Sequence, residues 1–128
     1  MRTTRRLETP VDPLPGRGLR RFVGRNSAIE SEEMTVGTAL YADEFGPMEP
    51  HHHAEETVYV LDADRAWVRW GPAPDDLPNR IDLHPGVVIN TPSLEWHVFE
   101  WEPGGYVELL FIYGQVDNIR PEDTELDA

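Results

Sequence analysis

Short stretches of alternating apolar and polar residues recur along this chain, and groups of turn-forming residues separate them. Alternation with a period of two places successive side chains on opposite faces of a strand. The predicted strands lie at 34–43, 56–61, 65–70, 80–83, 86–91, 96–101 and 106–113. The second and third form a hairpin turning at Asp62–Asp64, and Pro103-Gly104-Gly105 separates the last two. Such short, closely spaced strands indicate an all-β sandwich or barrel without a long helix.

The charged residues are unevenly distributed along the chain. Its 128 residues fit a single domain. Residues 1–25 hold seven arginines and two acidic residues, a balance of +5. The other 103 residues hold four arginines and 22 acidic residues, a balance of −18. We therefore expect a basic N-terminal arm at 1–25, a β-barrel at 26–115 and an acidic tail at 116–128. Opposite charges suggest that the arm lies on a body, its own or a partner's.

The composition narrows the classes of chemistry that this chain can perform. It has no cysteine and no lysine, which excludes disulfides, thiolate metal sites, cysteine nucleophiles and lysine Schiff bases. A net charge of −13 argues against a nucleic-acid partner. No apolar run approaches the ~20 residues of a membrane span, and no secretory signal is visible. We expect a cytoplasmic protein whose chemistry rests on His, Glu, Asp, Tyr and Arg.

Three consecutive histidines, His51-His52-His53, precede the acidic pair Glu55-Glu56. In extended backbone, the first and third histidine of the run share one face while the middle one faces away. A carboxylate on the adjoining strand can approach the same point. Two imidazoles and a carboxylate suit a divalent transition metal. Taken alone, the run is equally consistent with a polar loop of solvated histidines.

A second histidine motif changes this balance. The stretch from Gly86 to His97 predicts a strand, a turn led by Pro92 and a returning strand. In this stretch the sequence resembles the cupin superfamily, because Gly86, Pro92 and His97 stand at the spacing of the second cupin motif. Leu94 replaces the motif's glycine, and Trp101 replaces its asparagine.

The histidine run resembles the first cupin motif more loosely. Gly46 lies four residues before His51 rather than five, and Glu56 follows His53 after two residues rather than three or four. Ala63 stands where the closing glycine is expected. The resemblance spans roughly residues 34 to 113 and implies a double-stranded β-helix, or jelly-roll barrel, with a metal held inside one end.

The resemblance implies four metal ligands. They are His51, His53, Glu56 and His97. A one-residue slip in register would exchange the faces and bring in His52, and Glu55 is the alternative carboxylate. The implied cofactor is a divalent transition metal: Fe, Mn, Ni, Zn, Co or Cu.

Five further residues are candidates for roles around this metal. Phe99 and Trp101 share a face with the metal-ligating histidine of their strand, so they line the pocket if that histidine points inward. Tyr59 is a third lining candidate, and Tyr41 offers a hydroxyl. Glu108 lies within the largely apolar stretch 106–113 and is a candidate acid or base if it faces inward. Core packing or an outward, salt-bridged position explains these residues as well.

We therefore predict a metal-dependent enzyme that acts on a small, oxygen-rich molecule. The reaction type stays open among dioxygenase, isomerase, lyase and cyclase. The alternatives are a ligand-binding or sensory protein without turnover and a metal-free structural protein. Because cupins commonly pair through their sheets, the resemblance also implies a homodimer, with no nucleic acid or membrane as partner.

Overall fold

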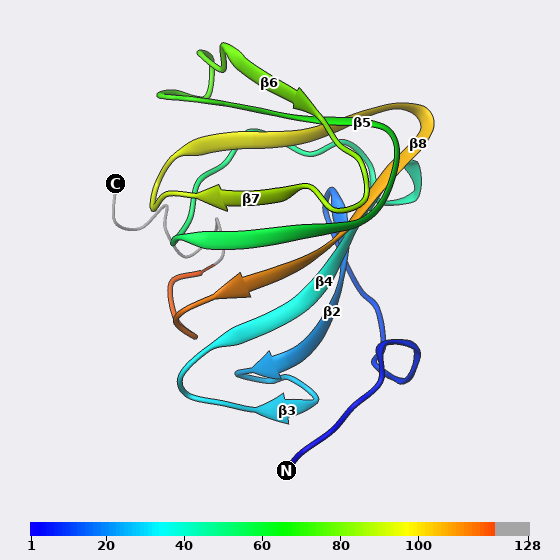
Figure 1. Ribbon diagram of the computed structural model, residues 1–128, viewed down its shortest axis with the longest axis vertical. Coiled ribbons are helices and arrows are strands. Elements are labelled where there is room, and N and C mark those ends of the chain that lie inside the picture. Colours follow the sequence, from blue (N-terminus) through cyan, green and yellow to red (C-terminus); the bar gives the residue numbers. More distant parts are fainter. Residues whose placement is uncertain (120–128) are drawn as a thin grey trace.

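The computed structural model describes residues 1–119, and β-strands dominate them (Figure 1). The strands are β1 (Asp12–Leu14), β2 (Arg17–Gly24), β3 (Ile29–Glu30), β4 (Thr35–Ala42), β5 (Glu56–Gly71), β6 (Asn79–Asp82), β7 (Val88–Thr91) and β8 (Trp96–Tyr113). The two helical elements are single 3-10 turns, η1 (Arg6–Glu8) and η2 (Asp43–Phe45). Within the described residues, no helix is long and apolar enough to cross a membrane. The all-β prediction is confirmed.

One antiparallel ribbon of two long strands, β5 and β8, organises the molecule. These strands pair over their whole length, from Glu56 opposite Tyr113 to Gly71 opposite Trp96. The full sheet order is β1-β2-β4-β8-β5-β6, with β3 added to β2 and β7 added to β5. The ribbon curves round so that its two halves face each other across the core (Figure 1). This arrangement is a single-domain jelly roll.

The predicted hairpin at Asp62–Asp64 is wrong, and so is the predicted strand break at Pro103-Gly104-Gly105. Both segments lie inside continuous strands, where they form the corner of the ribbon. Arg65 has φ 50° and Gly104 has φ 81°, and the pairing register shifts between Asp64 and Ala66. A side chain on Gly105 would place its Cβ 2.5 Å from the Asp64 carbonyl oxygen. The turn-forming residues therefore bend the ribbon instead of reversing the chain.

The burial of alternate residues along β8 shows which face is internal. Val107, Leu109, Phe111 and Tyr113 are buried, whereas Ile112 on the opposite face is 37% exposed. The internal side chains pack against buried residues of the neighbouring strands, among them Val58, Val60, Ala39 and Tyr41. The core therefore lies between the facing halves of the roll.

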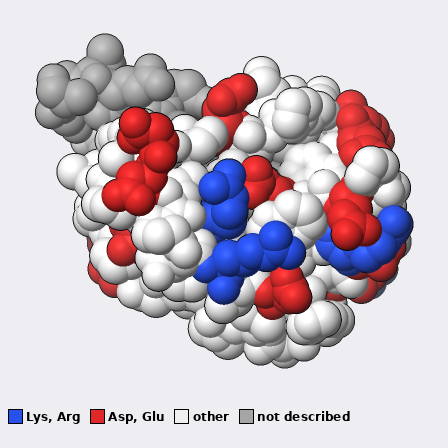
Figure 2. Space-filling model, turned by 90° about the horizontal axis from the view of Figure 1, so that it is seen from above, with Lys and Arg blue, Asp and Glu red and all other residues white. Residues whose placement is uncertain are grey.

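The basic N-terminal segment contributes two strands to one side of the same sheet, because β1 pairs with β2 and β2 pairs with β4. Its first residues also contact the chain's own body. Arg6 forms an ion pair with Glu108, and Arg20 donates hydrogen bonds to the carbonyl oxygens of Arg6 and Thr9. The acidic tail predicted at 116–128 lies outside the described residues from position 120 onward. On the face seen in Figure 2, arginines lie beside acidic side chains.

Candidate metal centre

Backbone pairing brings the two histidine motifs together. His51 and His97 form an isolated antiparallel bridge, in which each N–H donates to the other's carbonyl oxygen at 3.0 Å. His53 lies two residues further on and faces the same point. One ring nitrogen from each of the three histidines lies within 4.8 Å of the others. The predicted convergence of His51, His53 and His97 is therefore present.

The backbone fixes the orientation of all three rings. The Nδ1 atoms of His51, His53 and His97 lie at 3.0, 2.8 and 2.9 Å from backbone carbonyl oxygens. The acceptors are the carbonyl groups of Glu49, Ala54 and Glu95. Because a carbonyl oxygen only accepts, each Nδ1 carries the proton and donates it. Each Nε2 of a neutral ring is then left with a lone pair, which is the arrangement that metal-ligating histidines need.

The distance between two of these nitrogens fits a metal ion. His53 Nε2 and His97 Nε2 lie 3.1 Å apart. Two lone pairs at that distance repel each other unless a cation lies between them. Metal–nitrogen bonds of about 2.1 Å place neighbouring nitrogens of an octahedral shell about 3.0 Å apart. The donor set therefore fits a divalent transition metal.

Burial keeps these histidines in the form that binds metal. The His53 and His97 side chains are 3% and 2% exposed. Burial lowers the pKa of His53 to about 4 and the pKa of His97 to about 4. For His51, burial first and the neighbouring His97 second hold the pKa well below 6.5. All three rings are consequently neutral near pH 7, so protons compete little with a metal there.

Glu56 approaches the histidines from the start of β5. Its Oε1 lies 3.7 Å from His53 Nε2, and the carboxylate accepts a hydrogen bond from Tyr113, its opposite residue on β8. Burial raises the pKa of Glu56, while His97 and the Tyr113 hydrogen bond oppose the rise. Glu56 is thus placed beside the three histidines as a fourth candidate ligand.

The two alternative ligands point elsewhere. The His52 ring packs edge-on against Trp96, with ring centroids 4.2 Å apart. The exposed Glu55 accepts a hydrogen bond from Asn90 at 3.1 Å. Strand alternation explains both positions, because residues 52 and 55 lie one position away from residues that face inward.

The histidines open into a cavity of about 460 Å³. Its aromatic wall comes from Tyr41, Phe111 and Tyr113. His51, His53 and Glu56 line the same cavity, and arginines of β2 lie along its edge. A space of this size, with a few convergent polar groups, suits a small molecule.

Comparison with known proteins adds the fold family. No protein-family model matches the chain, and no curated protein matches its sequence. The polyketide cyclase RemF from Streptomyces resistomycificus is 19% identical, with 100% of this chain and 94% of that chain covered and a TM-score of 0.69. A protein from Planctomyces limnophilus is 17% identical over 96% of this chain and 94% of its own, with a TM-score of 0.70. The DMSP lyase DddQ from Ruegeria pomeroyi DSS-3 is 14% identical over 87% of this chain and 58% of its own, with a TM-score of 0.66. The chain has the cupin fold.

One departure from the cupin motif has a visible structural effect. Leu94, which replaces the motif's glycine, adopts φ 65° in the turn between β7 and β8. Its N–H donates a hydrogen bond of 2.8 Å to the His53 carbonyl oxygen. The turn therefore holds the histidine run in place through a leucine in a left-handed conformation that glycine adopts without strain.

The predicted lining residues divide between two hollows of the cupin barrel. Tyr41 lines the histidine cavity and stacks on Phe99, with ring centroids 4.8 Å apart. Phe99 and Trp101 instead line a second hollow of about 310 Å³ beyond that stack, where the Trp101 indole donates to Asp43 at 2.7 Å. Tyr59 is 47% exposed on the outer face of β5. Of the residues predicted beside the metal ligands, Tyr41 alone lines their cavity.

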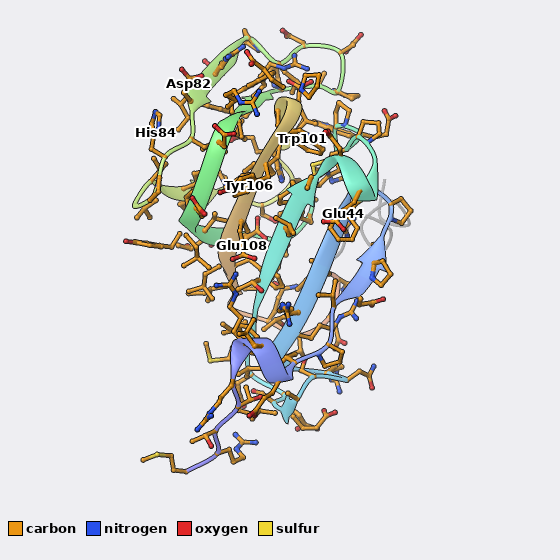
Figure 3. All side chains as sticks on the ribbon, turned by 90° about the vertical axis from the view of Figure 1, so that its right-hand side faces the viewer. Glu44, Asp82, His84, Trp101, Tyr106 and Glu108 are labelled. Carbon is orange, nitrogen blue, oxygen red and sulfur yellow. The ribbon has the colours of Figure 1, made fainter. Side chains whose placement is uncertain are left out.

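Glu108 lies on the outer face of the cupin sheet, as its position in Figure 3 shows. It alternates with the buried Val107 and Leu109, so it cannot face the interior. Its carboxylate pairs with Arg6 of the N-terminal segment. The inward orientation on which its candidate acid–base role depended is therefore absent.

Sequence reasoning did not single out Tyr113, Phe111 or Arg17. Alternation places Tyr113 and Phe111 together on one face of β8, but both faces are largely apolar and the pattern does not tell which is internal. Arg17 had counted only toward the charge of the N-terminal segment. Its place in the cavity depends on long-range pairing between β2 and β4, which leaves no local signal.

Proposed function

We propose that this cupin is a metal-dependent enzyme acting on a small, oxygen-rich substrate. His51, His53 and His97 would hold a divalent transition metal, with Glu56 as the fourth ligand. The observation that carries the proposal is the 3.1 Å separation of two lone-pair nitrogens whose rings are fixed by backbone carbonyl groups. With both Nδ1 atoms protonated, a cation between the two Nε2 atoms would stabilise that arrangement of neutral rings.

Among the reaction types expected from the sequence, ring closure on a polyoxygenated precursor has the best support. RemF is named a polyketide cyclase, and it matches this chain over nearly the full length of both. The aromatic wall of Tyr41, Phe111 and Tyr113 suits a flat, unsaturated substrate. A bound metal would act as a Lewis acid that polarises a substrate carbonyl group.

The residues of the cavity would support this chemistry in two ways. Burial raises the pKa of Tyr41 and of Tyr113, so both hydroxyl groups stay protonated near pH 7, and the Tyr41 hydroxyl could donate a hydrogen bond to a substrate. The Tyr113 hydroxyl holds the Glu56 carboxylate at the metal site. The aromatic rings would also exclude water and hold a folded chain with its reacting carbons close together.

Metal analysis of the untagged protein tests the metal centre. We expect close to one equivalent of a transition metal by inductively coupled plasma mass spectrometry. A His97→Ala variant should lose it, while the matched His52→Ala variant should keep it. The proposal would be contradicted if the wild-type protein contained no metal after purification and took up none when metal was added. The remaining interpretation would then be a metal-free structural cupin.

A linear diketo acid, with two ketone groups and a terminal carboxylate, is the probe that tests the reaction type. The metal-loaded protein should convert it into a cyclic product that has lost water, as read by mass spectrometry, without consuming dioxygen at an oxygen electrode. Dioxygen consumption would indicate a dioxygenase instead. Tight binding of the probe without turnover would indicate a ligand-binding cupin.

We also propose that the protein is a homodimer. The outer sheet face carries exposed apolar side chains on adjacent strands, with Tyr59 opposite Val88 and both more than 45% exposed. Burying such a patch against a second copy removes apolar surface from water. Light scattering should give the mass of a dimer, and Val88→Asp should reduce it to a monomer. A wild-type chain that stays monomeric at tens of micromolar would contradict this.

A further inference from the structure

A row of arginines from β2 lines one side of the histidine cavity. Arg17, Leu19 and Arg21 alternate along the strand toward the cavity, and Arg25 follows just beyond the strand end. Arg21 forms an ion pair with Asp12, and Arg25 pairs with Asp117 at 2.9 Å. Three of the chain's 11 cationic side chains therefore gather at one hollow.

The hollow is far less acidic than the protein as a whole. Among the described residues, its three arginines are balanced by the carboxylates of Asp12, Glu56 and Asp117, the partner of Arg25, so the formal balance is zero while the histidines are neutral. The whole chain carries −13. A divalent metal would add two positive charges. A positive cavity in an acidic protein favours and concentrates small anions.

Arg17 is the lining arginine whose charge acts on the buried groups of the site. It is half-buried at the start of β2 and lines the same cavity as the aromatic wall. Its positive charge is close enough to lower the pKa of several buried groups of the cavity. Those groups are Tyr41, His51, His53, Glu56 and Tyr113.

We propose that Arg17 binds an anionic group of the substrate, so that the substrate is a carboxylate or enolate rather than a neutral ketone. The guanidinium would hold one oxygen anion while a neighbouring oxygen of the same molecule reaches the metal. A planar guanidinium donates two parallel hydrogen bonds to a carboxylate, which fixes orientation as well as charge. This inference rests on the proposed metal centre and names the class of molecule that the centre receives.

Two matched probes test the inference by binding, without turnover. Salicylate and salicylamide have the same ring and differ by one negative charge at the carboxyl position. The cobalt-loaded protein is titrated with each by isothermal calorimetry, after its metal content has been measured. Wild type should bind salicylate at least tenfold more tightly than salicylamide. Arg17→Gln should weaken salicylate at least tenfold, leave salicylamide within twofold and keep one equivalent of cobalt.

Two further variants distinguish a direct contact between Arg17 and salicylate from an effect of the protein's overall charge. Arg5→Gln removes the same charge from an exposed position on the N-terminal segment, outside the cavity, and should leave salicylate binding unchanged. Arg17→Lys keeps the charge but loses the paired hydrogen bonds, and should fall between Arg17→Gln and wild type. Circular dichroism checks that each variant is folded.

The outcomes distinguish the two proposals. Full cobalt loading with no preference of wild type for salicylate, or with no loss in Arg17→Gln, would overturn the role of Arg17 and leave the metal centre standing. If Arg17→Gln does not fold, Arg17→Lys decides, and a salicylate affinity equal to that of wild type would then overturn the role of Arg17. A wild-type protein that takes up no cobalt would overturn the metal centre, and the inference with it.

Discussion

Replacing Leu94 by glycine tests whether the turn that supports the histidine run is strained. Leu94 has φ 65°, and its side chain is 53% exposed. A residue with a Cβ loses roughly 1–2 kcal/mol in the left-handed region. Glycine loses about 0.5–1 kcal/mol relative to alanine because its unfolded chain is more flexible. At this position the first effect exceeds the second.

Alanine is the control that isolates the backbone effect. Leu94→Ala and Leu94→Gly remove the same exposed contacts, but alanine keeps the Cβ that opposes a positive φ. We therefore expect Leu94→Gly to be about 0.5–1 kcal/mol more stable than Leu94→Ala. At the neighbouring exposed Ser93, which is not among the residues with positive φ, the order should reverse by a similar amount.

Urea unfolding, followed by tryptophan fluorescence, measures all four variants. The free energies of unfolding should rank glycine above alanine at position 94 and below it at position 93. If glycine is the less stable residue at both positions, the left-handed conformation of Leu94 costs nothing and the reasoning fails. Metal content should be the same in both position-94 variants, since each keeps the N–H that the His53 carbonyl oxygen accepts.

Three other predictions follow from the site. In metal-free protein, His53 and His97 have pKa values of about 4 against 6.5 when unfolded, so the unfolded chain binds more protons and stability falls as pH drops through that window. For one such ring the full effect is about 3 kcal/mol, of which roughly 2 kcal/mol is lost between pH 7 and pH 5, and the coupled pair loses less than twice that amount. Urea midpoints of chelator-treated protein at these two pH values should show the loss. His51→Ala should abolish metal binding measured by plasma mass spectrometry, whereas metal loss in His52→Ala alone would mean that the histidine register is shifted by one residue. Glu108→Gln should lower the free energy of unfolding by less than about 1 kcal/mol and leave turnover intact; a large loss of turnover at full metal content would place Glu108 in the mechanism.

The alternating direction of side chains allowed the site histidines to be predicted, because this alternation is a local property of extended backbone. His51 and His53 converge while His52 points away, as the period of two requires. The same rule could not orient 106–113, since Phe111 and Ile112 are equally apolar and burial depends on what the rest of the chain places above them. Local pattern therefore fixes which residues share a face but not which face is internal.

The strand boundaries predicted from turn-forming residues were wrong for a related reason. Pro103-Gly104-Gly105 permits either a chain reversal or a sharp bend, and the choice is made by strands that pair far along the sequence. Asp64 lies opposite Tyr106 and Ala66 opposite Trp101, so the corner is held from both sides. Arg17 illustrates the limit most clearly, because only the long-range pairing of β2 brings an N-terminal arginine to a cavity built by β4, β5 and β8.

The sequence separation of the site histidines bears on the order of events during folding. His53 and His97 lie 44 positions apart in sequence, and their nitrogens meet where β5 and β8 are paired. Such non-local contacts slow folding, because the entropy of closing the loop between them is lost before the contact forms. A nascent chain that has emerged only as far as β6 holds two histidines of the site but lacks the third. Metal capture at full affinity would thus follow closure of the ribbon, and metal release would require the ribbon's open end to fray.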